Sequence, residues 1–325
     1  MRTENSALQD IDTIRSQAAL VHAKIPPTPQ IEWPLLSRRL QCSLWLKHEN
    51  YNPTGSFKVR GGLTYISELL AREATVKGVV AATRGNFGQS IAYASSQFGL
   101  PCVVVVPEGN SLDKNSLMQA LGAERITSGV DFDESIAAAK TIANERHYHL
   151  IPSFHADLIA GVSSYALELF EALPDLNRVY VPIGLGSGIC SVVNVRNALG
   201  LDCEIVGVVS ENANAYQLSF EAGKVMSTNT AETMADGLAV RNPSKDALTI
   251  ILDNVARIVS VSDTQINQMI NILFEDTHNI VEGAGAAAAA AVLKEKDLNK
   301  GQKVAAILTG SNINKALFAA ALLAE

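Results

Sequence analysis

The chain has few of the features that mark disulfide-rich, metal-binding, membrane or nucleic-acid-binding proteins. Its four cysteines lack CxxC spacing, and its six histidines show no HExxH motif. The net charge is −7, whereas binding to nucleic acid needs a basic face. No apolar run reaches the ~18 residues that span a bilayer. We therefore expect buried free thiols, and no metal site, no nucleic acid partner and no membrane span.

The N-terminal segment also lacks the character of a secretory signal. Residues 1–10 are polar and include acidic side chains. Apolar residues make up 47% of the chain and charged residues 18%, which is enough for a sizeable core. We expect a cytoplasmic protein without a further regulatory domain.

Short β-branched runs alternate with Ala-rich amphipathic stretches along most of the chain. This alternation predicts an α/β fold with parallel-rich sheets covered by helices on both faces. Ligands in such folds bind at the carboxyl ends of the strands. The expected strands are residues 43–47, 78–82, 102–106, 178–183, 204–209 and 303–308. The expected helices are residues 10–22, 86–98, 113–121, 131–145, 187–198 and 314–323, and Ala286–Ala291 is expected to lie in a closely packed buried helix.

The pattern divides into two blocks, which we interpret as two domains. Residues 56–149 form one compact run of strand–helix units. Residues 1–55 and 150–325 are expected to form a larger domain, with the active site in the cleft between the two.

One lysine has an unusual setting. The string Asn52-Pro-Thr-Gly-Ser-Phe-Lys58-Val-Arg-Gly-Gly62 places Lys58 in a tight polar turn just before an expected helix. Most lysines are solvated surface charges, but a lysine held in a cleft shifts its pKa readily, which suits Schiff-base chemistry. The string therefore marks Lys58 as a candidate reactive amine.

Three strand-to-helix turns are rich in Gly and small polar residues. The turn at residues 83–90 presents backbone amides that suit a carboxylate, although it is equally read as an ordinary Gly turn capped by Asn86. The turn at residues 181–189 has the layout that cradles phosphate, with close helix–strand packing as its alternative. It matches neither the P-loop nor the dinucleotide fingerprint. The turn at residues 308–312 is by itself only a polar turn.

Together these segments resemble the fold type II (tryptophan synthase beta-like) pyridoxal-phosphate (PLP) enzymes, in the group of threonine/serine dehydratase and serine racemase. The family carries a lysine string, an asparagine loop, a glycine-rich phosphate loop and a hydroxyl-bearing turn in this order. All four occur here over residues 52–312, and residues 235–240 add a fifth matching segment. The resemblance covers nearly the whole chain.

The resemblance implies a role for each matching position. Lys58 would carry the cofactor, and Ser56 and Phe57 would line it. Asn86 would bond the pyridoxal hydroxyl, and Thr309 would face the ring nitrogen. The remaining implied contacts are Gly237 along the ring, the backbone of Gly184, Leu185, Gly186, Ser187 and Gly188 at the phosphate, and the segment Thr83, Arg84, Gly85, Asn86 and Phe87 at the substrate carboxylate.

Several departures from the family pattern narrow the expected reaction. Related racemases have a serine where Arg84 stands, and a guanidinium with a pKa above ~12 is a poor proton donor or acceptor. Arg84 is expected to clamp a carboxylate, to contact a substrate side chain or to form a structural salt bridge. The family's divalent metal site would fall on Val209, Ala213 and Ala215, which offer no side-chain oxygen. Phe87 replaces a histidine that many relatives have.

The implied activity is a PLP-dependent lyase that converts L-threonine, or serine, to a 2-oxo acid and ammonia. Alternatives are dehydration of another 3-hydroxy amino acid, bulkier or acidic, which Arg84 and Phe87 leave open, and, less favoured, serine racemisation or β-replacement synthesis. A hydroxyl at Thr309 cannot keep the cofactor ring charged as an Asp would, which favours elimination over transamination. A ligand-binding protein that kept the fold without chemistry is the alternative of a different class. We expect a small amino-acid substrate and a homo-oligomer.

Overall fold

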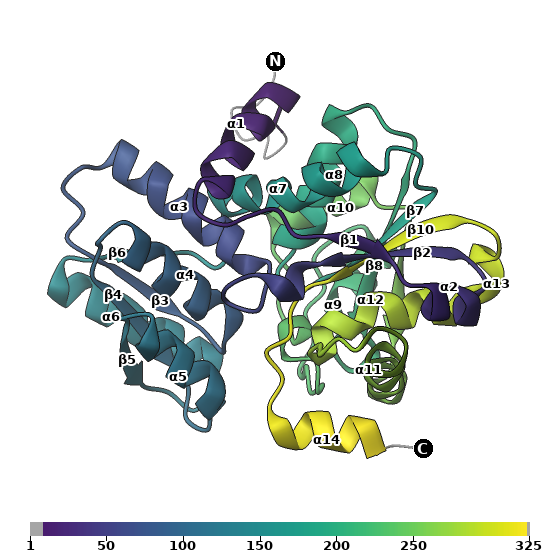
Figure 1. Ribbon diagram of the computed structural model, residues 1–325. Coiled ribbons are helices and arrows are strands. Elements are labelled where there is room, and N and C mark those ends of the chain that lie inside the picture. Colours follow the sequence, from purple (N-terminus) through teal and green to yellow (C-terminus); the bar gives the residue numbers. More distant parts are fainter. Residues whose placement is uncertain (1–8, 324–325) are drawn as a thin grey trace.

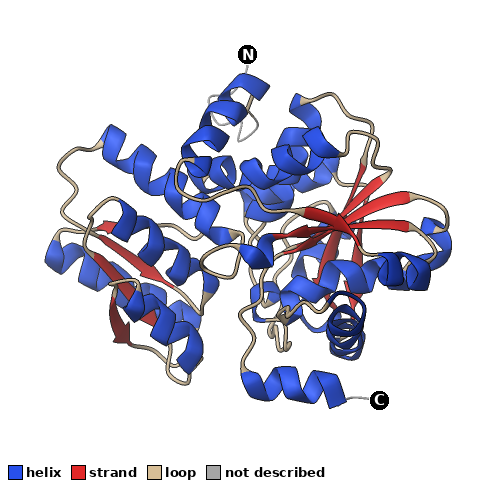
Figure 2. Cartoon of the chain, viewed as in Figure 1, coloured by secondary structure: helices blue, strands red, loops and turns tan. Residues whose placement is uncertain are grey.

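The computed structural model describes residues 9–323 and contains two β-sheets, each layered between helices (Figures 1 and 2). The expected α/β class with parallel-rich, helix-covered sheets is confirmed. All four cysteines are buried and free, as expected. Within the described part of the chain, no helix is both long and apolar enough to cross a membrane.

The larger sheet has six strands in the order β1-β2-β10-β7-β8-β9. Only β1 is antiparallel to its neighbour; the other strands are parallel. Parallel strands need crossover helices, which explains why this sheet is assembled from distant parts of the sequence. The strands are β1 (Gln30–Glu32), β2 (Ser43–His48), β7 (Arg178–Pro182), β8 (Glu204–Ser210), β9 (Arg257–Val261) and β10 (Lys303–Leu308).

Side chains of the central strands alternate between two cores, because successive residues of a strand point to opposite faces. In β7, Val179 and Val181 enter one core, whereas Tyr180 enters the other. The first core packs against α1 (Ile11–His22), α7 (Ala156–Ala172), α8 (Ser187–Ala198) and α10 (Lys245–Asn254). The second packs against α2 (Pro34–Leu40), α11 (Asp263–Thr277) and α12 (Gly283–Lys294).

The smaller sheet is parallel, with strands in the order β5-β4-β3-β6. One face is covered by three helices and the other by α6. Its strands are β3 (Val79–Ala82), β4 (Cys102–Val106), β5 (Glu124–Thr127) and β6 (His149–Leu150). Its helices are α3 (Lys58–Arg72), α4 (Asn86–Gln97), α5 (Leu112–Ala120) and α6 (Phe132–Arg146). The remaining elements are η1 (Glu49–Tyr51), α9 (Ala215–Ala222), η2 (Glu211–Ala213), η3 (Asp236–Leu238), α13 (Lys296–Asn299) and α14 (Lys315–Leu323).

The alanine-rich helix α12 is buried along its length, as the sequence predicts. Ala286–Ala291 are each at most 2% exposed. The small side chains let α12 lie close to the sheet, and its first turn presses on the loop after β10. A Cβ added at Gly285 would lie 2.5 Å from the carbonyl oxygen of Gly310. This close approach fixes the loop that carries Thr309.

A buried ionic cluster fixes the start of α3 against the larger sheet. Arg60 is fully buried and donates to Glu49 Oε2 at 2.7 Å and to Glu168 Oε1 at 2.6 Å. Lys47, also fully buried, donates to Glu168 Oε2 at 2.5 Å. Arg60 is two residues after Lys58, so the cluster anchors the turn in which Lys58 lies.

Candidate active site

A cavity of about 700 Å³ opens at the carboxyl ends of β3 and β7. The cavity is lined from the side of the smaller sheet by the loop after β3 and the start of α6, and from the side of the larger sheet by the loop after β7 and the segment 229–242. Carboxyl ends of parallel strands are where α/β folds bind ligands. Nine residues expected at the site line the cavity directly: Lys58, Thr83, Arg84, Gly85, Asn86, Phe87, Leu185, Ser187 and Gly237.

Lys58 is the first residue of α3, and its side chain enters the cavity. Its Nζ lies 4.7 Å from the centre of the Phe57 ring. Burial lowers the pKa of Lys58 below its ordinary value of 10.5, and the Glu282 carboxylate partly opposes that effect. A larger fraction of this amine is therefore neutral near pH 7 than for a surface lysine, and a neutral amine is a nucleophile and a base.

Two hydroxyls beside Lys58 are buried without hydrogen-bond partners. Ser56 is fully buried and Thr309 is 6% exposed, and neither side-chain oxygen is bonded within residues 9–323. The two segments are held together, because the Phe57 amide donates to the Thr309 carbonyl at 3.1 Å and Ser56 pairs with Gly310. An unsatisfied buried polar group costs about 1–3 kcal/mol, so this pair of hydroxyls is arranged for a ligand.

The loop between β7 and α8 is shaped by close backbone contacts. Gly186 has φ +107°, a left-handed conformation that favours glycine. A Cβ at Gly184 would lie 2.4 Å from the Gly237 carbonyl oxygen, so the two segments touch. Tyr216 holds the loop from outside by donating to the Leu185 carbonyl at 2.9 Å.

The first amides of α8 face an open end of the helix. Within the described residues, no acceptor bonds the amides of Ser187 and Gly188. Gly188 also leaves its Cα face open, since an added Cβ would meet nothing closer than 3.6 Å. Open amides at a helix N-terminus favour an anion such as phosphate.

The loop after β3 is organised by the Thr83 hydroxyl. Thr83 Oγ1 accepts from the amides of Gly85 and Gly88, each at 2.9 Å. The amides of Asn86 and Phe87, between them, have no acceptor within residues 9–323. The loop therefore offers two adjacent backbone donors to a carboxylate, while the Thr83 side chain supports the loop.

The Asn86 side chain bonds an acid at the start of α12. Asn86 Nδ2 donates to Glu282 Oε1 at 2.6 Å. Glu282 precedes α12 but makes no capping hydrogen bond with it, so its carboxylate serves the site and not the helix end. Burial raises the pKa of Glu282, and the Lys114 ammonium and the bond from Asn86 oppose that rise.

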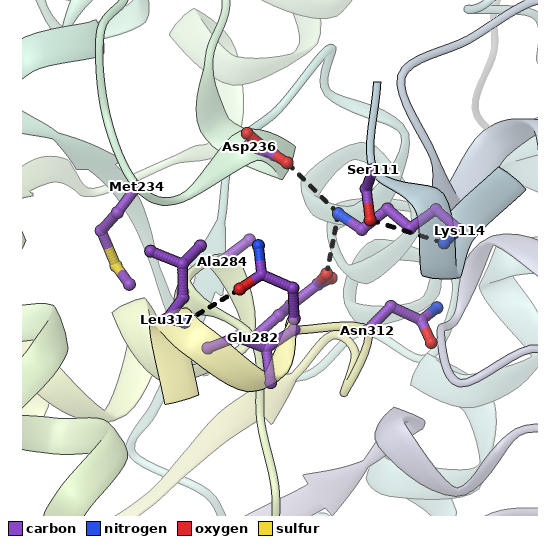
Figure 3. Close-up of a pocket in the computed structure, with 11 residues that line it drawn as sticks. Ser111, Lys114, Met234, Asp236, Glu282, Ala284, Asn312 and Leu317 are labelled. Carbon is purple, nitrogen blue, oxygen red and sulfur yellow. Dashed lines mark hydrogen bonds and ion pairs between the residues drawn. The ribbon is translucent and has the colours of Figure 1, made fainter. Parts of the chain in front are cut away.

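Lys114 joins the two sides of the site (Figure 3). Its Nζ lies 3.3 Å from Asp236 Oδ2 and 3.7 Å from Glu282 Oε2. Lys114 comes from α5 beside the smaller sheet, whereas both acids come from the side of the larger sheet. Asn312 makes a second bridge, donating to Asn86 Oδ1 and Gln89 Oε1, each at 2.8 Å.

At the outer part of the cavity, Arg241 pairs with acids at the start of α6. Its Nη2 lies 2.5 Å from Asp133 Oδ2 and 3.9 Å from Asp131 Oδ2. This pair also links the segment 229–242 to the smaller sheet's layer. Arg84 is exposed and lines the same cavity, and no ion pair or hydrogen bond of its guanidinium occurs within residues 9–323.

Six residues expected at the site do not line the cavity itself. Ser56, Phe57 and Thr309 lie directly beside Lys58, and Gly184, Gly186 and Gly188 shape the loop after β7. Lys114 and Arg241 were not predicted at the site, and no local motif marks them, because their partners are distant in the chain. Asp236 and Asn312 lie in the matching segments 235–240 and 308–312, but no role was expected of their side chains.

A family model described as pyridoxal-phosphate dependent enzyme matches residues 21–310. The chain belongs to this family. This result agrees with the resemblance expected from the lysine string and the three turns.

The relatives and solved structures that the chain resembles include ammonia-lyases, a threonine deaminase and a serine racemase. The chain is 36% identical to an L-threonine ammonia-lyase of Thermotoga maritima over 86% of this chain and 70% of the relative. It is 31% identical to an L-threo-3-hydroxyaspartate ammonia-lyase of Saccharomyces cerevisiae over 90% of each. Among solved structures, the processed form of a threonine deaminase from Solanum lycopersicum matches with TM-score 0.88 at 26% identity, covering 98% of this chain and 94% of that one. Maize serine racemase matches with TM-score 0.90 at 26% identity, covering 97% of each chain.

The residues present fit PLP. The cofactor carries an aldehyde, a phosphate, a ring nitrogen and a ring hydroxyl. The Lys58 amine, the open amides of Ser187 and Gly188, the unpartnered hydroxyl of Thr309 and the Asn86 side chain offer one suitable group for each.

Proposed function

We propose that this chain is a PLP-dependent ammonia-lyase that converts L-threonine, and also serine, to a 2-oxo acid and ammonia by β-elimination. The observation that carries the proposal is Lys58, an amine with a lowered pKa that enters the cavity beside two unpartnered hydroxyls. The relatives named as threonine ammonia-lyases support the choice of reaction.

In this proposal each part of the cofactor has its own holder. Lys58 would bind it covalently, the Asn86 side chain would bond the ring hydroxyl, and Thr309 would face the ring nitrogen. The amides at residues 184–188 would hold the phosphate, with Ser187 adding a hydroxyl. Phe57 and Ser56 would line the cofactor beside the lysine, and Gly237, which has no side chain, would lie along its ring.

PLP, when bound, withdraws electrons from the substrate's Cα and so makes its proton removable. Lys58, freed when the substrate's amine replaces it, would take that proton, because burial lowers the pKa of its amine and the amine lies within the cavity. The amides of Asn86 and Phe87 bind the α-carboxylate and orient the Cα–H bond toward Lys58. Loss of the β-hydroxyl as water and hydrolysis then release 2-oxobutanoate and ammonia.

Arg84 makes racemisation a poor alternative. Racemisation needs an acid on the face opposite Lys58, and a guanidinium holds its proton too firmly for that role. Dehydration of a different 3-hydroxy amino acid is the alternative that the comparisons support, since the relatives include an ammonia-lyase named for 3-hydroxyaspartate.

We also propose that the two sheets mark two domains, residues 1–55 with 150–325 and residues 56–149, with the substrate entering between them. Two separate sheets with cores of their own support this division. Lys114, Asn312 and Arg241 bridge the two layers beside the cavity. We further propose a cytoplasmic homo-oligomer.

The test is a product assay. The purified protein supplied with PLP should release 2-oxobutanoate and ammonia in equal amounts from L-threonine, and Lys58→Ala should lose at least about 10³-fold in rate, because it lacks both the cofactor link and the base. Arg15→Ala, at an exposed ion pair on α1, is the matched control. A wild-type protein that binds PLP but releases ammonia from neither threonine nor serine, and forms neither 2-oxobutanoate nor pyruvate, would refute the proposal.

A further inference from the structure

Arg84 is a cation without a partner in a cavity whose other charges are mostly neutralised. Lys114 and Arg241 are each held by two carboxylates, and Lys58 lies near the Glu282 carboxylate. No carboxylate within residues 9–323 lies in ion-pair distance of the Arg84 guanidinium, although Arg84 lines the same cavity.

The place of Arg84 in its loop separates its charge from the binding of an α-carboxylate. The Thr83 hydroxyl fixes the loop, and the amides of Asn86 and Phe87 are open to a carboxylate. Backbone amides remain whichever residue stands at position 84. A neutral amino acid such as threonine has one carboxylate, so it leaves the guanidinium without an anion.

We propose that Arg84 binds a second carboxylate, carried on the substrate's Cβ. The substrate class is then an acidic 3-hydroxy amino acid, of which 3-hydroxyaspartate is the smallest. Guanidinium and carboxylate pair bidentately through two parallel hydrogen bonds, which gives direction as well as charge recognition. The inference rests on the proposed β-elimination and adds an acidic substrate, which Arg84 would favour over threonine.

The reaction balances without an oxidant or a reductant. The Cα–H and Cβ–O bonds of 3-hydroxyaspartate break, and water leaves with the proton and the hydroxyl. Hydrolysis then returns one water and releases ammonia. The products are oxaloacetate and ammonia, as threonine gives 2-oxobutanoate and ammonia.

Glu232 offers the competing explanation. It is exposed and lines the cavity from the segment 229–232. If Arg84 served to pair with Glu232 when the cavity closes, the pair would be structural, and replacing either residue would affect every substrate equally. Glu232→Gln is therefore the matched control for Arg84→Gln.

The experiment measures kcat and KM for L-threo-3-hydroxyaspartate and L-threonine. We expect Arg84→Gln to raise KM for hydroxyaspartate about 10- to 100-fold more than KM for threonine, with kcat little changed, because one charged hydrogen-bonded pair is lost. Arg84→Lys should recover part of the difference. Glu232→Gln should shift both substrates alike. Equal changes for both substrates in Arg84→Gln would overturn the inference.

Calorimetry gives a readout that does not need turnover. Succinate mimics the two carboxylates of the acidic substrate, and butyrate is similar in size with one carboxylate. Wild type loaded with PLP should bind succinate at least about 10-fold more tightly than butyrate, and Arg84→Gln should abolish that preference. A preference kept in the variant refutes the role of Arg84. Wild type that binds succinate as expected but releases ammonia from neither amino acid refutes the proposed function alone.

Discussion

Replacing Arg60, at the centre of the buried ionic cluster, should lower the free energy of unfolding. Arg60→Met removes the guanidinium that hydrogen-bonds both Glu49 and Glu168, and leaves Lys47 and the His22 imidazole as the remaining basic partners of Glu168. Removing one partner of a buried ion pair costs about 3–5 kcal/mol, because an uncompensated charge stays buried. An unfolding entropy of about 2.1 cal/mol/K per residue gives ~0.7 kcal/mol/K for this chain, so Tm should fall by about 4–7 °C.

The assay is thermal unfolding followed by circular dichroism, with Arg15→Met as control. Arg15 pairs with Glu171 at the surface, where side-chain exposures of 54% and 47% make the pair worth at most about 1 kcal/mol. That control should lower Tm by no more than ~1.5 °C. An Arg60→Met protein that is as stable as Arg15→Met would refute the reasoning.

The pH dependence adds a second check on the same cluster. Burial alone would raise the pKa of Glu168, but Arg60 and Lys47 outweigh it and the net pKa is lowered. The ionised carboxylate therefore stabilises wild type above the unfolded pKa, and this contribution is lost as pH falls through the folded pKa. Without Arg60 the pKa of Glu168 rises, and protonation of Glu168 then removes the cost of burying its charge in the variant. The Tm gap between the two proteins should narrow as pH falls from 7 to about 4.

Three further predictions concern the site. Gly186→Ala should weaken PLP binding in an absorbance titration and lower the free energy of unfolding by more than about 1–2 kcal/mol. The reason is that Gly186 has φ +107° and an added Cβ would lie 2.6 Å from a neighbouring carbon. The control Gly200→Ala, at φ +65° with open space around it, should cost only the backbone strain and leave PLP binding intact. Thr309→Val should raise the Kd for PLP several-fold without lowering the Tm of the cofactor-free protein, because its hydroxyl has no protein partner among the described residues; a large Tm loss would contradict this. Acetylation of Lys58 in the cofactor-free protein should have a pH midpoint below 10.5, and Glu282→Gln should move it lower still, because the carboxylate that raises the pKa is gone; an upward shift would count against the assigned cause.

Much of the fold was predictable from local patterns. The strand at residues 303–308 and the helix at residues 187–198 appear with the expected limits. The 17-residue helix α7 was not predicted, because twelve of its residues are buried and the apolar stripe that marks a surface helix is absent. The short edge strands β1, β5 and β9 also lack a distinctive pattern, since their pairing depends on the neighbouring strand.

The site was predictable where glycines and small polar residues mark a turn, and not where contacts join distant segments. Lys58 and the loop after β7 come from continuous motifs. Lys114 reads as a solvated charge on a helix, yet it is buried between Asp236 and Glu282. Thr83 was expected at the substrate, but its hydroxyl is committed to two amides of its own loop. Such hydrogen bonds depend on the backbone geometry of the folded loop, which cannot be read from the residue pattern.

Covalent labelling can identify the lysine that carries the cofactor, which we propose is Lys58. Two lysines line the cavity: Lys58, whose amine makes no ion pair within residues 9–323, and Lys114, which lies within an ion-pair cluster. Borohydride reduction of the PLP-loaded protein, followed by digestion and mass spectrometry, locates the lysine that holds the cofactor. We expect a pyridoxyl-phosphate adduct on the peptide containing Lys58. An adduct on Lys114, or none on either lysine, would contradict it.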